Sequence, residues 1–177
     1  KPTDFKNDQV LMGATRFGGQ SLYDSQDQFN AAYASTLVTQ MGAGNFSPID
    51  LRKFLAGKSV SASPRFGILS EGWGGQCGSA DIESMLQLVH LYATQPRKDP
   101  ELFGSFVSKQ KDYLRNIMSD PEIVYQDSLQ KILYQHNPRA PRVPRSDDFD
   151  KINVDRSLAI FSERLGNAQG LSFCFVG

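Results

Sequence analysis

The sequence predicts an α+β fold: a two-layer sandwich in which several helices pack on one face of a mainly antiparallel sheet. Two observations lead to this prediction. Apolar alternation typical of strands is confined to residues 7–20, 58–77 and 171–177. Helical patterns instead come in groups, two before the predicted hairpin and about four after it. Strict alternation of strands and helices, which would indicate a parallel sheet, is absent from the pattern.

The first strand and two helices are predicted in the N-terminal third. Residues 7–20 are expected to form a strand that leads into a turn at two glycines. Residues 24–44 predict a helix, because apolar side chains recur every four residues at Phe29, Tyr33, Leu37 and Met41. Residues 47–57 predict a second helix, with Ser47 placed to cap it and Pro48 at its first position.

The next segment, residues 58–77, predicts a hairpin that turns near Pro64 and Gly67. Its second arm contains the run Gly72, Gly74 and Gly75, which resembles a phosphate-binding loop only superficially. A Lys-Ser/Thr pair does not follow, and the pattern G-x-G-x-x-G is incomplete. We therefore expect these glycines to permit a bulge or the close approach of another backbone.

The C-terminal half is predicted to be mostly helical. Residues 79–95 are apolar on more than one side, so we expect this helix to be deeply buried. Residues 99–118 and 120–134 each open with Asp-Pro-Glu, which predicts an aspartate cap followed by proline at the first helical position. Three prolines make residues 136–148 an extended loop, and residues 153–166 predict the last helix.

Residues 171–177 predict the last strand of the sheet. Its sequence, "LSFCFVG", places apolar side chains at both alternating sets of positions. A strand that is apolar on both faces is typical of a central strand covered on both sides. We therefore expect this strand to lie in the middle of the sheet.

Length, charge and composition narrow the class of protein. The 177 residues suit one domain, and 19 basic residues balance 19 acidic residues. This balance argues against a nucleic-acid partner or an anionic membrane, since both require a basic surface. No apolar run approaches the ~20 residues of a membrane span. Cys77 and Cys174 do not make a disulfide framework and leave the redox compartment open.

The residue types needed for catalysis are sparse. The two histidines, His90 and His136, have no metal-ligating neighbour at helical spacing, and we expect His90 to be a packed histidine. The sequence contains no H-x-x-E-H, H-x-x-x-H, C-x-x-C, G-x-S-x-G or P-loop motif. Glu71 and Glu83 are separate acids that no spacing brings together. We therefore predict no catalytic residue and no metal site within these 177 residues.

Three arginines in the Pro-rich loop are the candidates for substrate binding. Arg139, Arg142 and Arg145 could grip carboxylates or a peptide backbone from an extended segment. The alternative is a solvated connection between helices, and Asp147 and Asp148 favour it because they follow at once.

Several stretches together resemble one family, the insulinase/pitrilysin-like zinc metallopeptidases, or inverzincins. The most specific is "IFSERLGNAQGLSFCFVG" at the C-terminus. Supporting stretches are "FGGQSLYD", "SEGWGG", "LVHLYATQPRKDPELF", "DPEIVYQDSL" and "YQHNPRAPRVP". The resemblance implies the mitochondrial-processing-peptidase-like metallohydrolase fold, in agreement with the two-layer fold predicted from the pattern.

The chain departs from the family at the motif that binds zinc. The resemblance implies H-x-x-E-H on the first long helix, where two histidines bind zinc and the glutamate activates water. Residues 28–41 contain neither His nor Glu, and Glu83 on the later helix cannot make a site alone. The resemblance therefore implies no cofactor in this segment and places zinc in the catalytic domain of a parent protein.

The resemblance implies a role within a larger peptidase. Residues 1–177 are expected to be an excised domain, truncated at both ends, that resembles the third of four related domains enclosing a chamber. The expected partners are the other domains of the parent chain and the peptide substrate. Two alternatives stay open: a metal-free docking subunit that pairs with a separate catalytic chain, and an unrelated α+β binding module. The resemblance favours a bacterial periplasmic or envelope location, which composition does not support.

Overall fold

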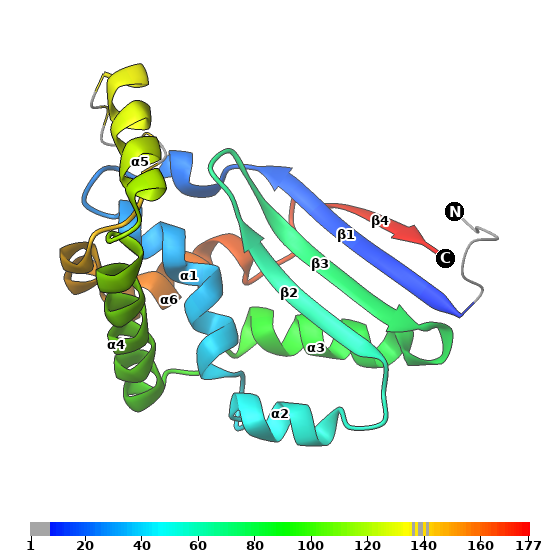
Figure 1. The fold of residues 1–177 in the computed structure, drawn as a ribbon. Coiled ribbons are helices and arrows are strands. Elements are labelled where there is room, and N and C mark those ends of the chain that lie inside the picture. Colours follow the sequence, from blue (N-terminus) through cyan, green and yellow to red (C-terminus); the bar gives the residue numbers. More distant parts are fainter. Residues whose placement is uncertain (1–7, 136, 138–139, 141) are drawn as a thin grey trace.

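A four-stranded antiparallel sheet with helices on one face forms the body of the protein (Figure 1). The computed structural model describes residues 8–135, 137, 140 and 142–177. The strand order is β2-β3-β1-β4. The strands are β1 (Gln9–Phe17), β2 (Val60–Phe66), β3 (Ser70–Gly78) and β4 (Ser172–Val176). This arrangement confirms the predicted α+β two-layer fold.

The described residues form six α-helices, and the caps predicted for three of them, Ser47, Asp99 and Asp120, are confirmed. The Ser47 hydroxyl accepts from the Asp50 N–H at the start of α2, and the Asp99 carboxylate accepts from Leu102 N–H at the start of α4. The helices are α1 (Gln28–Met41), α2 (Pro48–Phe54), α3 (Ile82–Thr94), α4 (Pro100–Ile117), α5 (Pro121–Leu133) and α6 (Val154–Leu165). The 3₁₀ turns are η1 (Gly19–Leu22), η2 (Ser79–Asp81) and η3 (Ser146–Lys151).

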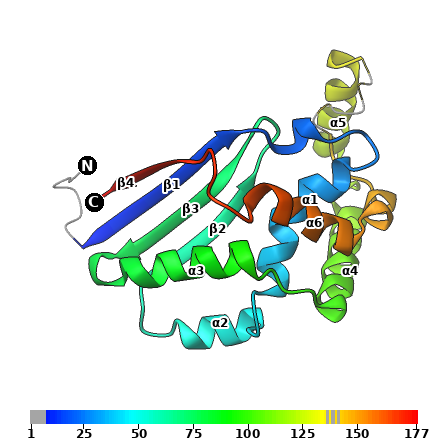
Figure 2. The ribbon, with the colours of Figure 1, turned by 180° about the vertical axis from the view of Figure 1, so that it is seen from behind.

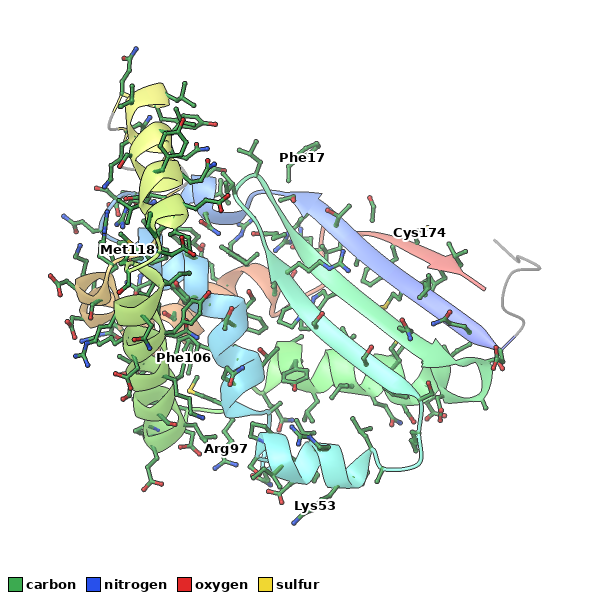
Figure 3. The ribbon with its side chains drawn as sticks, in the orientation of Figure 1. Phe17, Lys53, Arg97, Phe106, Met118 and Cys174 are labelled. Atoms are coloured by element: carbon green, nitrogen blue, oxygen red, sulfur yellow. The ribbon has the colours of Figure 1, made fainter. Side chains whose placement is uncertain are left out.

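Helix α1 packs against two separate cores. The predicted apolar stripe accounts for only one of these two contact sides. Its small residues Ala31 and Ala34 belong to the core beneath the sheet. The predicted stripe instead joins a second core between α1, α4 and η3. This second core comprises Leu37, Met41, Phe106 (Figure 3), Leu114, Phe149 and Ile152, with Phe29 and Tyr33 packed against it. Alanine on the sheet side lets the helix approach the strands closely while its large side chains fill the other core.

The hairpin forms as predicted, except that Pro64 lies inside β2 rather than at the turn. Pro64 pairs with Trp73 of β3, and residues 67–69 make the turn. Because β2 is an edge strand, the missing N–H of proline is tolerated there. The prediction for the glycines is confirmed at Gly72, where an added Cβ would lie 1.9 Å from the Ala14 carbonyl oxygen.

Helix α3 is amphipathic, so the prediction of deep burial was wrong. Its buried residues are Met85, Leu88 and Tyr92, whereas Ile82 and Leu86 are exposed. His90 is also exposed and is not the packed histidine we expected. The reason is that α3 covers the sheet with one side only, and the opposite side faces outward (Figure 2).

Strand β4 is an edge strand, and the prediction of a central, covered position was wrong. It pairs only with β1 among the described strands. Phe173 and Phe175 pair with Ala14 and Met12 of β1, so they point to the face that the helices occupy. The helices α3 and α6 contact β2 and β3, and β4 extends beyond them (Figure 2). The two phenylalanines are therefore 44% and 40% exposed, with their rings stacked.

Candidate functional site

The candidate arginines lie in the segment between α5 and η3. Arg142 and Arg145 are described, whereas Arg139 and the neighbouring His136 lie outside the described residues. Each of the two described arginines forms an ion pair with a buried aspartate of this same chain. The structure therefore shows what their guanidinium groups contact within the domain.

Asp148 of η3 holds Arg142. The Arg142 Nη1 donates to Asp148 Oδ2 at 2.6 Å, and the backbone N–H of Arg145 donates to the same oxygen at 2.7 Å. Lys151 Nζ lies 3.1 Å from the other oxygen. Burial would raise the pKa of Asp148, but these donors outweigh it and lower the pKa to about 2. The carboxylate is thus charged and fully partnered at neutral pH.

Asp127 of α5 holds Arg145. Its Oδ2 accepts from Arg145 Nη2 and lies 2.8 Å from Lys131 Nζ, and its Oδ1 accepts from the Val143 N–H at 3.2 Å. Burial would raise the pKa of Asp127, yet the bonds from Lys131 and Val143 and the charge of Arg145 lower it overall. Two aspartates from different elements therefore fix the course of this segment.

These pairs explain what the arginines do within the domain. The side chains of Arg142 and Arg145 are 29% and 40% exposed, so part of each guanidinium faces solvent. Arginine has five N–H donors, and each guanidinium uses only some of them in its aspartate pair. Contact with a substrate stays a prediction for both residues. Their pairing with Asp127 and Asp148 is the structural role that the loop sequence did not reveal.

Arg142 also borders a hollow that the sequence did not indicate. The hollow has a volume of about 400 Å³ and lies between η1, the start of α1, the tip of the β2–β3 hairpin and the segment around Pro144. Its apolar lining comes from Tyr23, Phe29, Ile68, Leu69, Ala140 and Pro144. The only sequence signal was the pair of branched apolar residues in the hairpin turn, where polar residues are usual.

Glu71 lies at the centre of a buried charge cluster, which was also missed. Its Oε1 is 2.7 Å from both Arg16 Nε and Arg164 Nη2, and its Oε2 accepts from the Gly19 N–H at 2.9 Å. Burial would raise the pKa of Glu71, but Arg164, Gly19 and Arg16 together lower it. Glu83, by contrast, accepts from Gln87 on the exposed side of α3. The two glutamates therefore have separate partners and do not form a pair.

The residues of α1 do not fit a zinc ion. The buried side chains on this helix are Asn30, Ala31, Ala34, Leu37, Val38 and Met41, and Asn30 is occupied by bonds to Asp27 and Asn153. None of them offers the imidazole or carboxylate that zinc takes in hydrolases. Within the described part of the chain, no group of three or more His, Cys, Asp or Glu residues could hold a metal ion.

Comparison with known proteins places these features in context. No family model matches the chain. A protein of Arabidopsis thaliana named "Zinc protease PQQL-like" is 25% identical over 135 residues, which is 76% of this chain and 12% of that protein. The chain therefore spans about an eighth of the length of this relative. Across the described residues, none of the helices has the length and apolarity to cross a membrane.

Solved structures of proteases share the fold. The periplasmic protease PqqL from Escherichia coli matches 99% of this chain with 19% of its own, at a TM-score of 0.79 and 16% identity. The ferredoxin protease FusC, solved in complex with Arabidopsis ferredoxin, matches 96% with 18% of its own, at a TM-score of 0.75 and 17% identity. A protease from Helicobacter pylori matches 99% with 42% of its own, at 0.71 and 10%.

Proposed function

Because the chain is related in sequence and in fold to a part of the insulinase-like zinc proteases, we propose that it is a non-catalytic domain of a multi-domain zinc metallopeptidase. In this proposal residues 1–177 form one domain that walls the chamber and contacts the peptide substrate. Hydrolysis belongs to a zinc ion and a glutamate-activated water held elsewhere in the parent protein.

The composition of α1 is the observation that supports the non-catalytic role. In the family that the chain resembles, the first long helix provides the zinc ligands. Here the corresponding helix contains neither His nor Glu, and its buried side is made of alanine, leucine, valine and methionine around Asn30. A helix packed in this way contributes to a core and offers no metal ligands.

The exposed apolar side of α5 supports packing against other domains. Helix α5 projects from the rest of the molecule (Figure 1), and its exposed apolar residues are Val124, Tyr125, Ile132 and Leu133, with Tyr134 following. Ile132 is 70% exposed. Exposed apolar patches of this kind are typical of surfaces that another protein surface covers. The other domains of the parent chain are the proposed cover.

The alternative is a metal-free docking subunit that pairs with a separate catalytic chain. The same features of α1 and α5 support it, because they do not distinguish a covalently linked catalytic domain from a separate catalytic chain. The open reading frame around this segment distinguishes the two proposals. H-x-x-E-H in the same reading frame supports the domain, and its absence there supports the subunit. The location of PqqL in the periplasm favours that compartment for this protein too.

Removal of the segment from its parent protein tests the proposed role. We expect the parent that lacks residues 1–177 to keep its zinc and to lose most of its peptide hydrolysis, and the separate 177-residue chain to restore it when added back. The variant Ile132→Asp, on the exposed apolar side of α5, should restore less activity than the unchanged chain. The control variant Gln40→Asp, at an exposed position of α1, should restore as much as the unchanged chain. Full hydrolysis by the shortened parent would contradict the proposal, and so would loss of its zinc.

A further inference from the structure

The hollow beside the hairpin tip has features of a binding pocket that are independent of the arginine pairs. We propose that it receives an apolar side chain, aromatic or branched aliphatic, of an extended polypeptide. This rests on the proposed function in one respect: that polypeptide is taken to be the peptidase substrate. The argument depends on how the pocket is held, on its charge and on its size.

The walls of the pocket are held in place by backbone contacts. The Gly18 N–H donates to the Leu69 carbonyl at 3.0 Å, and the Ser21 N–H donates to the Ile68 carbonyl at 2.9 Å. Gly19 has a φ of +71°, and a Cβ there would lie 2.3 Å from the Gly67 carbonyl oxygen. Only glycine therefore permits η1 to lie this close to the hairpin turn. The hairpin tip is thus fixed before any ligand arrives, which reduces the entropic cost of binding.

The described lining of the pocket carries no unpaired charge. Among its described lining residues Arg142 is the one with a formal charge, and that charge is paired with Asp148. Tyr23 stays a neutral phenol, because burial and the nearby Glu163 raise its pKa to about 12. The polar groups of the lining have partners within the chain: the Gln20 amide donates to the Phe66 carbonyl, and the Ser21 hydroxyl donates to the Gly18 carbonyl.

Because the polar groups of the lining already form hydrogen bonds within the domain, the pocket favours an apolar side chain as its occupant over a small polar metabolite. Small-molecule sites combine apolar walls with a few convergent polar groups that fix orientation. Here Gln20, Ser21 and Arg142 each already donate a hydrogen bond within the domain. A lipid surface is disfavoured for a similar reason, because anionic membranes attract unpaired basic clusters. An apolar side chain leaves no polar group of its own unpaired when it enters such a pocket.

The volume and the rim favour an extended peptide over a folded domain surface. About 400 Å³ lies within the range of side-chain-sized and small-ligand pockets and is too small for a helix face. Apolar residues continue beyond the pocket at Phe17, which is 94% exposed and stands clear of the ribbon at the end of β1 (Figure 3). Leu22 is exposed on η1. A peptide whose central side chain fills the pocket can contact this rim with its neighbours.

Titration by nuclear magnetic resonance with capped pentapeptides tests the proposal. The probe is acetyl-Gly-Ser-Phe-Ser-Gly-amide, and the matched control peptide has Glu in place of Phe. We expect the Phe peptide to shift the amide signals of η1 and of the hairpin tip and the Glu peptide to shift none. Leu69→Ser should weaken binding about tenfold, because one apolar contact surface is lost. Ile49→Ser, at a similarly exposed apolar residue of α2 outside the pocket, should leave binding unchanged.

Three results would overturn the proposal. They are shifts that spread over α5 or β4, equal binding of the two peptides, and binding that Leu69→Ser leaves intact. Displacement of the Phe peptide by phosphatidylcholine–phosphatidylserine vesicles would assign the pocket to lipid instead. The titration uses no zinc and measures no cleavage. A negative titration therefore leaves the proposed domain role intact, and failure of the deletion experiment leaves the pocket intact.

Discussion

Glu71 is a single side chain on which three distant parts of the chain depend. It joins Arg16 of β1, Arg164 of α6 and the backbone of the turn at Gly19. A buried carboxylate between two arginines is costly to desolvate, and the geometry of its bonds offsets that cost. The cluster thereby fixes the position of α6 against the sheet and the shape of the turn that borders the apolar pocket.

Glu71→Gln should lower the free energy of unfolding by about 3 kcal/mol, because two mostly buried guanidinium groups lose their counter-charge. Urea denaturation followed by circular dichroism measures the change. The matched control is Glu83→Gln, since Glu83 is exposed on α3 and accepts a side-chain hydrogen bond from Gln87. That control should differ from the unchanged protein by less than about 0.5 kcal/mol. Equal losses in the two variants would contradict this account of Glu71.

At the scale of elements, η3 depends on Asp148. This carboxylate accepts from Arg142, Lys151 and the backbone of Arg145, so it ties the Pro-rich segment to the 3₁₀ turn and to the core at Phe149. Lys151 and Arg142 also lie over the Phe29 ring at 5.4 Å. The turn between α5 and α6 is therefore held by charge on one side and by aromatic packing on the other.

The pH dependence of stability should reflect Asp148. Its pKa in the folded protein, about 2, lies below the ordinary value of 3.8. The folded state therefore favours the charged form, and this contribution is complete above about pH 5 and is lost as pH falls through 3.8 towards about 2. It amounts to roughly 2 kcal/mol. Asp148→Asn should remove this acid-dependent part of the unfolding free energy measured between pH 5 and pH 2.5, and Asp147→Asn, at an exposed neighbour, should keep it. A slope that Asp148→Asn leaves unchanged would contradict the assignment.

The helices and strands could be predicted from the sequence better than the contacts between them, for a physical reason. Helix starts depend on a few adjacent residues, so Ser47 and Asp99 cap the helices as expected. The place of β4 at the sheet edge depends on pairing with β1, more than 150 residues earlier, and the apolar pattern of one strand does not encode it. Local composition indicated the fold and missed the sheet order.

The candidate site was predicted less completely than the fold. The tandem arginines were visible in the loop, but the aspartate that pairs with Arg145 lies on α5 and becomes a neighbour only after folding. The apolar pocket combines η1, the hairpin tip and the segment at Pro144, which are remote in sequence. Spacing along the chain predicts contacts within one helix or hairpin. The contacts of this site instead join different helices, turns and loops.

At the scale of the whole molecule, the exposed apolar surfaces differ in shape. The exposed apolar residues of α5 lie on a helix that projects from the molecule, and the hollow beside the hairpin tip is concave. Phe173 and Phe175 on β4 add an uncovered apolar edge to the sheet. Three apolar surfaces are thus exposed on the described part of the chain, as expected for the proposed domain of a larger peptidase.

The central claim is that this domain serves a peptidase without binding its metal. The most direct test is the zinc content of the purified 177-residue chain after dialysis against micromolar zinc at neutral pH, measured by atomic emission together with cleavage of a quenched fluorescent peptide. The account predicts far less than one zinc per chain and no cleavage, because α1 supplies no ligand set. One tightly held zinc per chain, with cleavage that a chelator abolishes, would contradict it.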